Sequence, residues 1–248
     1  MKRSTFYVAL LTTGLLLCAT SIRTVRGAQQ FSEAEIFFEL NHTDSDLGIH
    51  ASIDGEPWTD LEIQGPGSLR LLNVVSRGRL ATQGMTQLFF ESAEPEFEEL
   101  RPADFFRRFR EGRYNFDARA QEGGRIQGSA TLSHVLAAPP ANIRLNGVPA
   151  ARSCDDPLPT VLAPVMIDWD PVTQSHPEVG KRGPVTVRLY QLFVEREGVK
   201  FSLDLPPSVT AFEVPRGVTD LGRDFKFEII ARTTTGNNTA IESCFLVR

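Results

Sequence analysis

The stretch LGRDFKFEIIA, residues 221–231, carries the clearest structural signal in the chain. Its residues Phe225, Phe227, Ile229 and Ala231 stand two positions apart, with Lys226 and Glu228 among the residues between them. Alternation of this period is typical of a β-strand that buries one face and exposes the other. The stretch therefore predicts a half-buried strand of a β-sheet.

The same period recurs through the second half of the chain, residues 139–248. It is seen in VMIDWDP (165–171), VTVRLYQLFVE (185–195), FSLDL (201–205), VTAFEV (209–214) and IESCFLV (241–247). Turn residues, such as those of Gly236-Asn237-Asn238, separate the segments. This regular succession of strands and turns predicts a seven-stranded sandwich.

The first half of the chain has a similar pattern. Alternating apolar residues occur in AEIFFEL (34–40), LGIHASI (47–53), LEI (61–63), LRLLNVV (69–75), QLFFE (87–91), YNFDA (114–118) and IQGSATLSHV (126–135). We expect the chain to turn between them, at Asp44-Ser45-Asp46, Asp54-Gly55 and Arg77-Gly78 among other places. The first half therefore also predicts a β-sandwich.

One segment of the first half has helical spacing. In PADFFRRFR (102–110), the residues Phe105, Phe106 and Phe109 lie on one side of a helix, and Pro102 suits its first turn. We expect a short helix that caps one end of the first sandwich.

A change in composition separates the two halves. Prolines are concentrated between residues 137 and 160, and we place a domain boundary near Pro139. The predicted fold class is all-β, with two tandem β-sandwich domains at residues 29–138 and 139–248.

The second half resembles a fibronectin type III domain. That family has a core tryptophan on its second strand, which Trp169 matches. It also has a leucine and then an aromatic–x–aromatic–x–aliphatic–x–alanine run on its sixth strand, which Leu221 and residues 225–231 match. The resemblance covers residues 139–248 and implies an immunoglobulin/fibronectin III-like sandwich. Phe225 departs from the family, which usually has a tyrosine there that hydrogen-bonds the backbone.

The first half looks like the β domain that precedes such modules in secreted bacterial proteins. The segments at residues 36–58 and 111–135 carry this likeness. It transfers no activity to the chain.

The N-terminus has the features of a secretory signal peptide. Lys2 and Arg3 precede the apolar run FYVALLTTGLLLCA (6–19), which is shorter than the roughly 20 residues of a membrane-spanning helix. We predict a signal peptide within residues 1–28, no later membrane span, and a secreted or periplasmic protein. Cleavage near Ala19 or after Ala28 remains open. An uncleaved anchor and a lipoprotein acylated at Cys18 are the alternatives.

Export also bears on the other two cysteines, Cys154 and Cys244. Two thiols in an exported protein are expected to pair, and the bridge would be worth roughly 4 kcal/mol in the chain-entropy model. Two buried free thiols are the alternative. The family that the second half resembles usually lacks a disulfide. Its fold would nevertheless bring a residue near the first strand, such as Cys154, close to one on the last strand, such as Cys244.

Charge and motifs exclude several classes of function. The 248-residue chain has 26 Lys and Arg against 31 Asp and Glu, a net charge of −5, which argues against nucleic-acid binding. The sequence contains no HExxH, GxSxG or glycine-rich phosphate loop, and we predict no catalytic residue, metal or cofactor. The resemblance implies a non-catalytic binding or spacer protein. Its partner would be a protein or glycan at the cell exterior.

Two turns are the candidate binding loops. We expect the turns at residues 236–238 and 44–46 to be exposed at the ends of the sandwiches, where such folds present their loops. Asp44 and Asp46 also occupy the first two acidic positions of a calcium loop, but the later ligands are missing. A polar hairpin is the alternative interpretation of this segment.

Histidines supply the alternative function. His50 and His134 lie in predicted strands and could converge with Asp54 or Glu91 in a secreted hydrolase or hydrolase accessory. Packed or rim histidines are the simpler interpretation.

Aromatic and acidic segments provide further candidates. Phe89-Phe90 and Phe105-Phe106 place rings on both faces of their elements, so an exposed member could stack on a sugar or dock a partner. Core packing is the alternative. The glutamate-rich stretch at residues 91–99 predicts either a solvated loop or a docking site for a cationic partner.

Overall fold

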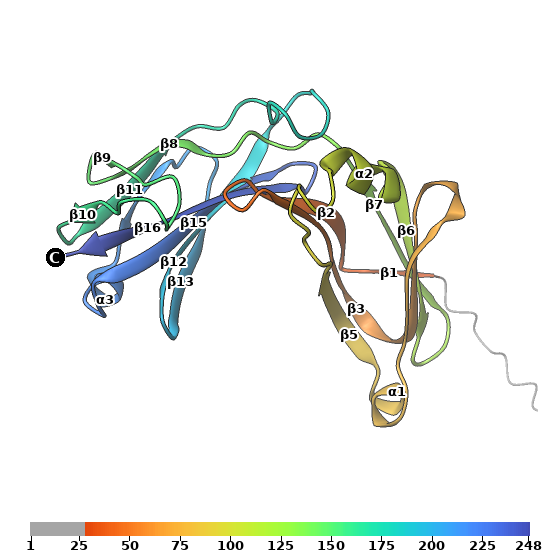
Figure 1. Cartoon of the computed structure of the whole chain (residues 1–248). Coiled ribbons are helices and arrows are strands. Elements are labelled where there is room, and N and C mark those ends of the chain that lie inside the picture. The colour runs from red at the N-terminus through yellow and green to blue at the C-terminus, as the bar shows by residue number, and fades with distance from the viewer. Residues whose placement is uncertain (1–27) are drawn as a thin grey trace, which may run out of the picture.

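The computed structural model describes residues 28–248, so the predicted signal peptide lies almost wholly outside the described residues. The chain folds into a 12-stranded sheet and a 4-stranded sheet (Figure 1). The all-β prediction is confirmed. Among the described residues, no helix is long and apolar enough to cross a membrane.

The N-terminal half contains seven of the strands and two α-helices. These are β1 (Gln29–Gln30), β2 (Glu33–Asn41), β3 (Asp46–Gln64), β4 (Arg70–Val75), α1 (Arg79–Gln83), β5 (Met85–Glu91), α2 (Pro102–Arg108), β6 (Gly112–Ala120) and β7 (Arg125–Leu132), with the 3-10 turn η1 (Pro66–Ser68).

The C-terminal half contains the remaining strands. These are β8 (Ala141–Leu145), β9 (Val148–Pro149), β10 (Thr160–Val161), β11 (Val165–Asp170), β12 (Val187–Arg196), β13 (Val199–Leu205), β14 (Ala211–Val214), the short helix α3 (Arg216–Thr219), β15 (Asp224–Thr233) and β16 (Asn238–Val247).

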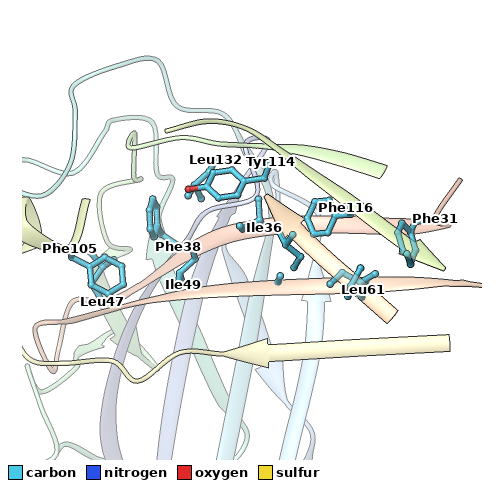
Figure 2. Packing of buried hydrophobic residues seen from close by; sticks show 14 of the residues in the cluster. Phe31, Ile36, Phe38, Leu47, Ile49, Leu61, Phe105, Tyr114, Phe116 and Leu132 are labelled. Carbon is cyan, nitrogen blue, oxygen red and sulfur yellow. The ribbon is translucent and has the colours of Figure 1, made fainter. Parts of the chain in front are cut away.

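The N-terminal core forms where the alternating residues of β2 and β3 meet those of β6 and β7. Ile36, Phe38, Leu47 and Ile49 are buried there, as the two-residue period predicts, and Phe116 packs from β6 (Figure 2). Burial of these side chains removes a large apolar area from water, which is the main stabilising contribution to such a sandwich.

Strand β3 corrects the prediction of a turn at Asp54-Gly55. The strand continues from Asp46 to Gln64 without interruption. Its first part pairs with β2 and β5, and its second part pairs with β4 and β6. Register shifts after Asp54 let the long strand pass from one layer of the sandwich to the other.

Helix α2 lies near the predicted position. Phe105 and Phe106 are buried in the N-terminal core, with Phe109 packed against it, and both rings of the buried pair make edge contacts with Phe38. The helix therefore closes the core next to β2 (Figure 2).

The C-terminal sandwich packs the order β14-β11-β8-β9 against the strands β13-β12-β15-β16. Trp169 on β11 is buried, with its ring edge-on to Tyr190, and Phe225, Phe227, Ile229 and Ala231 on β15 are also buried. Apart from the two-residue strands β9 and β10, these are the second and sixth strands of this half, as the resemblance implies.

Two details of the resemblance have different outcomes. The predicted disulfide between Cys154 and Cys244 is confirmed, and it ties the loop after β9 to the last strand. Leu221, however, does not occupy a core position. It is 45% exposed, in the loop between α3 and β15, because that segment turns away from the sheet before the strand begins.

The two sandwiches share hydrogen-bonded strands. Strand β16 of the second sandwich pairs in parallel with β2 of the first, with Asn238, Thr239 and Ala240 opposite Glu39, Leu40 and Asn41. The sheet consequently continues from one sandwich to the other and bends at this junction (Figure 1).

Candidate functional site

The turn before β16 is the centre of the junction. Gly236 takes a positive φ of 92° in this turn, a conformation that glycine adopts readily, and Asn237 follows it. The Asn237 side chain is 0% exposed. The expectation that residues 236–238 form an exposed binding loop is therefore wrong, because Asn237 and Asn238 are buried.

Asn237 links the two sandwiches through hydrogen bonds of its side-chain amide. Its Oδ1 accepts a hydrogen bond from the Phe38 backbone N–H at 2.9 Å. Its Nδ2 donates to the carbonyl oxygens of Ser133 at 2.8 Å and Val135 at 3.0 Å. One amide thus satisfies three backbone groups of the N-terminal half, which is what a buried polar side chain requires.

Further polar contacts cross the junction. Thr43 Oγ1 donates to the Glu242 carbonyl at 3.1 Å and accepts from the Glu242 N–H at 2.9 Å. Arg232 pairs with Glu35, and its guanidinium lies 5.2 Å from the centre of the Phe37 ring. The two sandwiches therefore meet through specific hydrogen bonds and charges as well as through the sheet.

A histidine pair also crosses it. His176 Nε2 lies 3.2 Å from His42 Nδ1, and His176 Nδ1 accepts from the backbone N–H of Val179 at 2.9 Å. Burial and, to a smaller extent, the neighbouring His42 lower the pKa of His176 from 6.5 to about 4. His176 is therefore neutral at ordinary pH.

The bend gives the shared sheet an inner face. Figure 1 shows that the four-stranded sheet and strands β6 and β7 lie outside the bend, so the opposite surface of β5, β3, β2, β16, β15, β12 and β13 faces inward. We define the inner face by the residues that alternate with the core positions on these strands: Gln87, Phe89, Glu91, His50, Ser52, Glu35, Phe37, Glu39, Asn238, Glu242, Lys226, Glu228, Ile230, Arg232, Gln191, Phe193, Glu195, Lys200, Ser202 and Asp204.

Acidic side chains outnumber basic ones on the inner face. Its three cations each have an acidic partner, Arg232 with Glu35, Lys226 with Glu242 and Lys200 with Glu195, and Arg188 of β12 also pairs with Glu35. Among the described residues, no ion pair uses Glu39, Glu91 or Glu228. The inner face therefore carries an excess of negative charge.

Titration of Glu228 reflects this excess. Glu228 lies directly opposite Glu242 on the neighbouring strand. Burial, followed by the charges of Glu39 and Glu242, raises the pKa of Glu228 from 4.5 to about 7. Asp46 behaves similarly: burial, then Glu94 and Asp44, raise its pKa from 3.8 to about 6.

His50 lies on the inner face next to Phe37 and Phe89. Its Nε2 is 2.8 Å from Glu94 Oε1. Burial disfavours the imidazolium, but the hydrogen bond to Glu94 and the charges of Glu39 and Glu91 outweigh it, so the pKa of His50 is raised. Gly48 makes room for this pair, because a Cβ there would collide with the Glu94 carboxylate.

The histidines form no catalytic group with a nucleophile. Among the described residues, the side-chain hydrogen bond of His50 is to Glu94, and no hydroxyl or thiol is bonded to it. His134 Nε2 lies 2.8 Å from the Phe109 carbonyl, and its ring packs against Phe106. The structure brings Glu91 opposite His50 but keeps His134 in a different environment.

The four phenylalanines considered as an aromatic platform differ in their exposure to solvent. Phe105 and Phe106 are core residues and cannot stack on a sugar. Phe89 is 56% exposed on the inner face, whereas Phe90 packs against the N-terminal core. Only part of the predicted aromatic platform is therefore accessible.

The turn at residues 44–46 forms the end of the β2–β3 hairpin. Asp44 Oδ2 accepts a hydrogen bond from Asn41 Nδ2 at 3.0 Å. The backbone of Asp46 forms an isolated antiparallel β-bridge with Glu96 of the acidic loop. Within residues 28–248, no group of three or more His, Cys, Asp and Glu side chains could hold a metal ion. The polar-hairpin interpretation accounts for the bonds observed here.

Sequence reasoning missed the role of Phe37 and Glu39. Both stand between core residues of β2, which made them look like the solvent side of an ordinary strand. Phe37 is instead buried, because β16 pairs with β2 and Arg232 and His50 cover the ring, and Glu39 is half-buried. The unusual signal was the phenylalanine at position 37, an apolar residue on the side that alternation assigns to solvent.

Comparison with known proteins adds little. No protein-family model matches the sequence, and no curated protein matches it. Three similar solved structures are the chicken CNTN1 FN1-FN3 domains, a two-domain fibronectin type III segment of chicken tenascin, and the human OSCAR ligand-binding domain.

Their similarity to the chain is low. The CNTN1 fragment has a TM-score of 0.35 and 9% identity over 90% of this chain, which spans 65% of that fragment. The tenascin segment gives 0.29 and 11% over 87% of this chain and 98% of its own. OSCAR gives 0.30 and 11% over 90% and 98%. At these values the matches carry no argument, and the fold assignment rests on the strands themselves.

Proposed function

We propose that the protein is an exported, non-catalytic binding protein whose two sandwiches present one joined surface to a protein or glycan at the cell exterior. The observation that carries the proposal is the junction, where β2 pairs with β16 and the buried Asn237 bonds three backbone groups. A simple spacer needs no shared sheet, whereas a binding surface that spans two sandwiches does require their mutual placement to be fixed.

Export is supported by two features. The first is the signal-like N-terminus, and the second is the disulfide between Cys154 and Cys244, which is typical of proteins that fold in an oxidising compartment. We propose a secreted or periplasmic location on these grounds.

We also propose that the domains comprise residues 29–138 and 139–248. The hydrophobic clusters support this division, since Leu136 belongs to the first cluster and Ala137 to the second. Val179 is an exception that reaches from the second half into the first core.

Capture from exported fractions tests the proposed function. The chain without residues 1–28 is immobilised and exposed to proteins and glycans of those fractions. We expect one ligand to bind saturably and to be displaced by the free chain. Absence of any saturable ligand would contradict the proposal.

An activity assay separates this function from the hydrolase alternative. Chromogenic esters and glycosides are incubated with the wild-type chain and with His50→Ala. We expect no turnover above background in either sample. Turnover that His50→Ala abolishes would replace the binding function with a hydrolytic one.

A further inference from the structure

The inner face offers more than a general excess of charge. Glu39 and Glu228 face inward from β2 and β15, on either side of β16, and neither forms an ion pair among the described residues, while Lys200 and Lys226 act on Glu228 from a greater distance. Strands in a sheet are about 4.8 Å apart, so the two carboxylates lie within reach of one cationic segment. Burial and mutual repulsion make this arrangement costly in the free protein.

A buried acceptor lies beside these carboxylates. Asn238 is 4% exposed, and its Nδ2 donates to Glu39 Oε2 at 2.7 Å. Its Oδ1 has no hydrogen-bond partner in the described structure. A buried acceptor without a donor is unfavourable, and an additional N–H group at this place would satisfy it.

The aromatic rings of the inner face also select cations. Lys200 Nζ lies 4.4 Å from the centre of the Phe193 ring, and Arg232 covers Phe37. The third ring, Phe89, is the most exposed, and no cation of the described residues lies over it. An aromatic face with neighbouring carboxylates is suited to a guanidinium or ammonium group.

We propose that the inner face binds an arginine- or lysine-rich segment of a partner protein, with cationic side chains at Glu39, Glu228 and the exposed ring of Phe89. Charge complementarity favours this occupant. A protein segment supplies several cations together with the aliphatic stems that pack on the exposed ring of Phe89, whereas a single metal ion would find no group of three suitable ligands among the described residues. The raised pKa values of Glu228 and His50 agree with a negative potential there. This inference rests on the proposed binding function and specifies its partner.

Peptide binding by the chain without residues 1–28 tests the assignment. The probes are a fluorescent peptide of alternating arginine and serine, and the same peptide with glutamine in place of arginine. Fluorescence anisotropy is measured for the wild-type chain, for the double variant Glu39→Gln/Glu228→Gln, and for the control Glu213→Gln/Asp220→Asn. At pH 8, where Glu228 is ionised, the control removes the same charge at exposed residues outside the inner face.

We expect the arginine peptide to bind saturably, the glutamine peptide not to bind, and Glu39→Gln/Glu228→Gln to weaken binding about tenfold or more. The control should change the affinity less than twofold. Equal weakening in both double variants, or unchanged binding in Glu39→Gln/Glu228→Gln, would overturn the assignment. Circular dichroism confirms that each variant is folded.

Two further results distinguish the inner face from the proposed function as a whole. If an exported ligand is captured equally well by the wild-type chain and by Glu39→Gln/Glu228→Gln, the inner-face assignment is wrong but the binding function stands. If sedimentation shows a dimer that only the inner-face variant abolishes, the occupant is a second copy, and the proposed cationic partner is wrong.

Discussion

Asn237 is the residue on which the junction depends most directly. Replacing it with alanine leaves the Phe38 N–H and the carbonyls of Ser133 and Val135 without their bonds in a buried place. Each such group costs about 1–3 kcal/mol, so we expect Asn237→Ala to lower the free energy of unfolding by about 3 kcal/mol. Urea denaturation measures this loss. The exposed Asn115→Ala is the control and should stay within about 0.5 kcal/mol of wild type.

Glu228 gives a prediction about pH. Its pKa is about 7 in the folded protein and near 4.5 when unfolded. Between these values the unfolded chain releases the proton that the folded chain keeps, so stability falls as pH rises and the loss is complete above pH 7. Glutamine mimics the protonated form. We therefore expect Glu228→Gln to stabilise the protein by about 2 kcal/mol at pH 8 and to have no effect at pH 4.

Urea denaturation midpoints of wild type and Glu228→Gln, measured from pH 4 to pH 8, test this prediction. Glu213→Gln, on the exposed surface of β14, serves as the control and should show no such trend. A Glu228→Gln variant that is less stable than wild type at pH 8 would show that the carboxylate is charged and stabilising in the folded protein.

Trp169 is a core residue of the C-terminal sandwich. Its ring is 3% exposed and packs against Tyr190 in the C-terminal core. Truncation of a buried aromatic side chain costs about 3–5 kcal/mol, and we expect this loss for Trp169→Ala. The more conservative Trp169→Phe should cost less. Thermal unfolding that is unchanged in Trp169→Ala would place the residue outside the core.

The disulfide between Cys154 and Cys244 links the loop after β9 to the last strand. Cys154 and Cys244 are separated by 90 positions, so a bridge between them strongly reduces the conformational entropy of the unfolded chain. We expect the double variant Cys154→Ser/Cys244→Ser to lose about 4 kcal/mol of stability. Mass spectrometry without reductant should also find the two cysteines two hydrogens lighter than free thiols, and free thiols would refute the bridge.

The elements are also where sequence reasoning succeeded and failed. Alternation placed β2, β11 and β15 well, because each buries one face in its own sandwich and the period of two follows directly. The prediction of a turn at Asp54-Gly55 was wrong. A dipeptide that is typical of turns also fits a long strand that passes from one layer to the other, as β3 does.

The candidate site was harder to predict than the strands. The disulfide followed from cysteine usage, but the burial of Asn237 did not follow from any local pattern. It depends on β16 meeting β2, and these strands are about 200 residues apart in sequence, as the separation of 199 between Asn237 and Phe38 shows. Pairing over such a distance leaves no periodic signal in either strand.

The junction predicts a single arrangement of the two sandwiches. Spin labels are placed at exposed Thr86 on β5 and Ser202 on β13, one on each arm of the bent sheet. We expect one narrow distance distribution in the wild-type chain and a broader one in Asn237→Ala. Asn115→Ala should keep the narrow distribution, and a broad one in the wild-type chain would mean that the sandwiches move independently.

The pairing of β2 with β16 has a consequence for any attempt to divide the chain. Separating the two halves would expose an edge strand in each fragment, β2 in one and β16 in the other. The backbone N–H and C=O groups of that edge would lack hydrogen-bond partners. Exposed edge strands pair with strands of other chains and so promote aggregation. Each half expressed by itself should therefore be prone to precipitate, and mixing the two during refolding should rescue both.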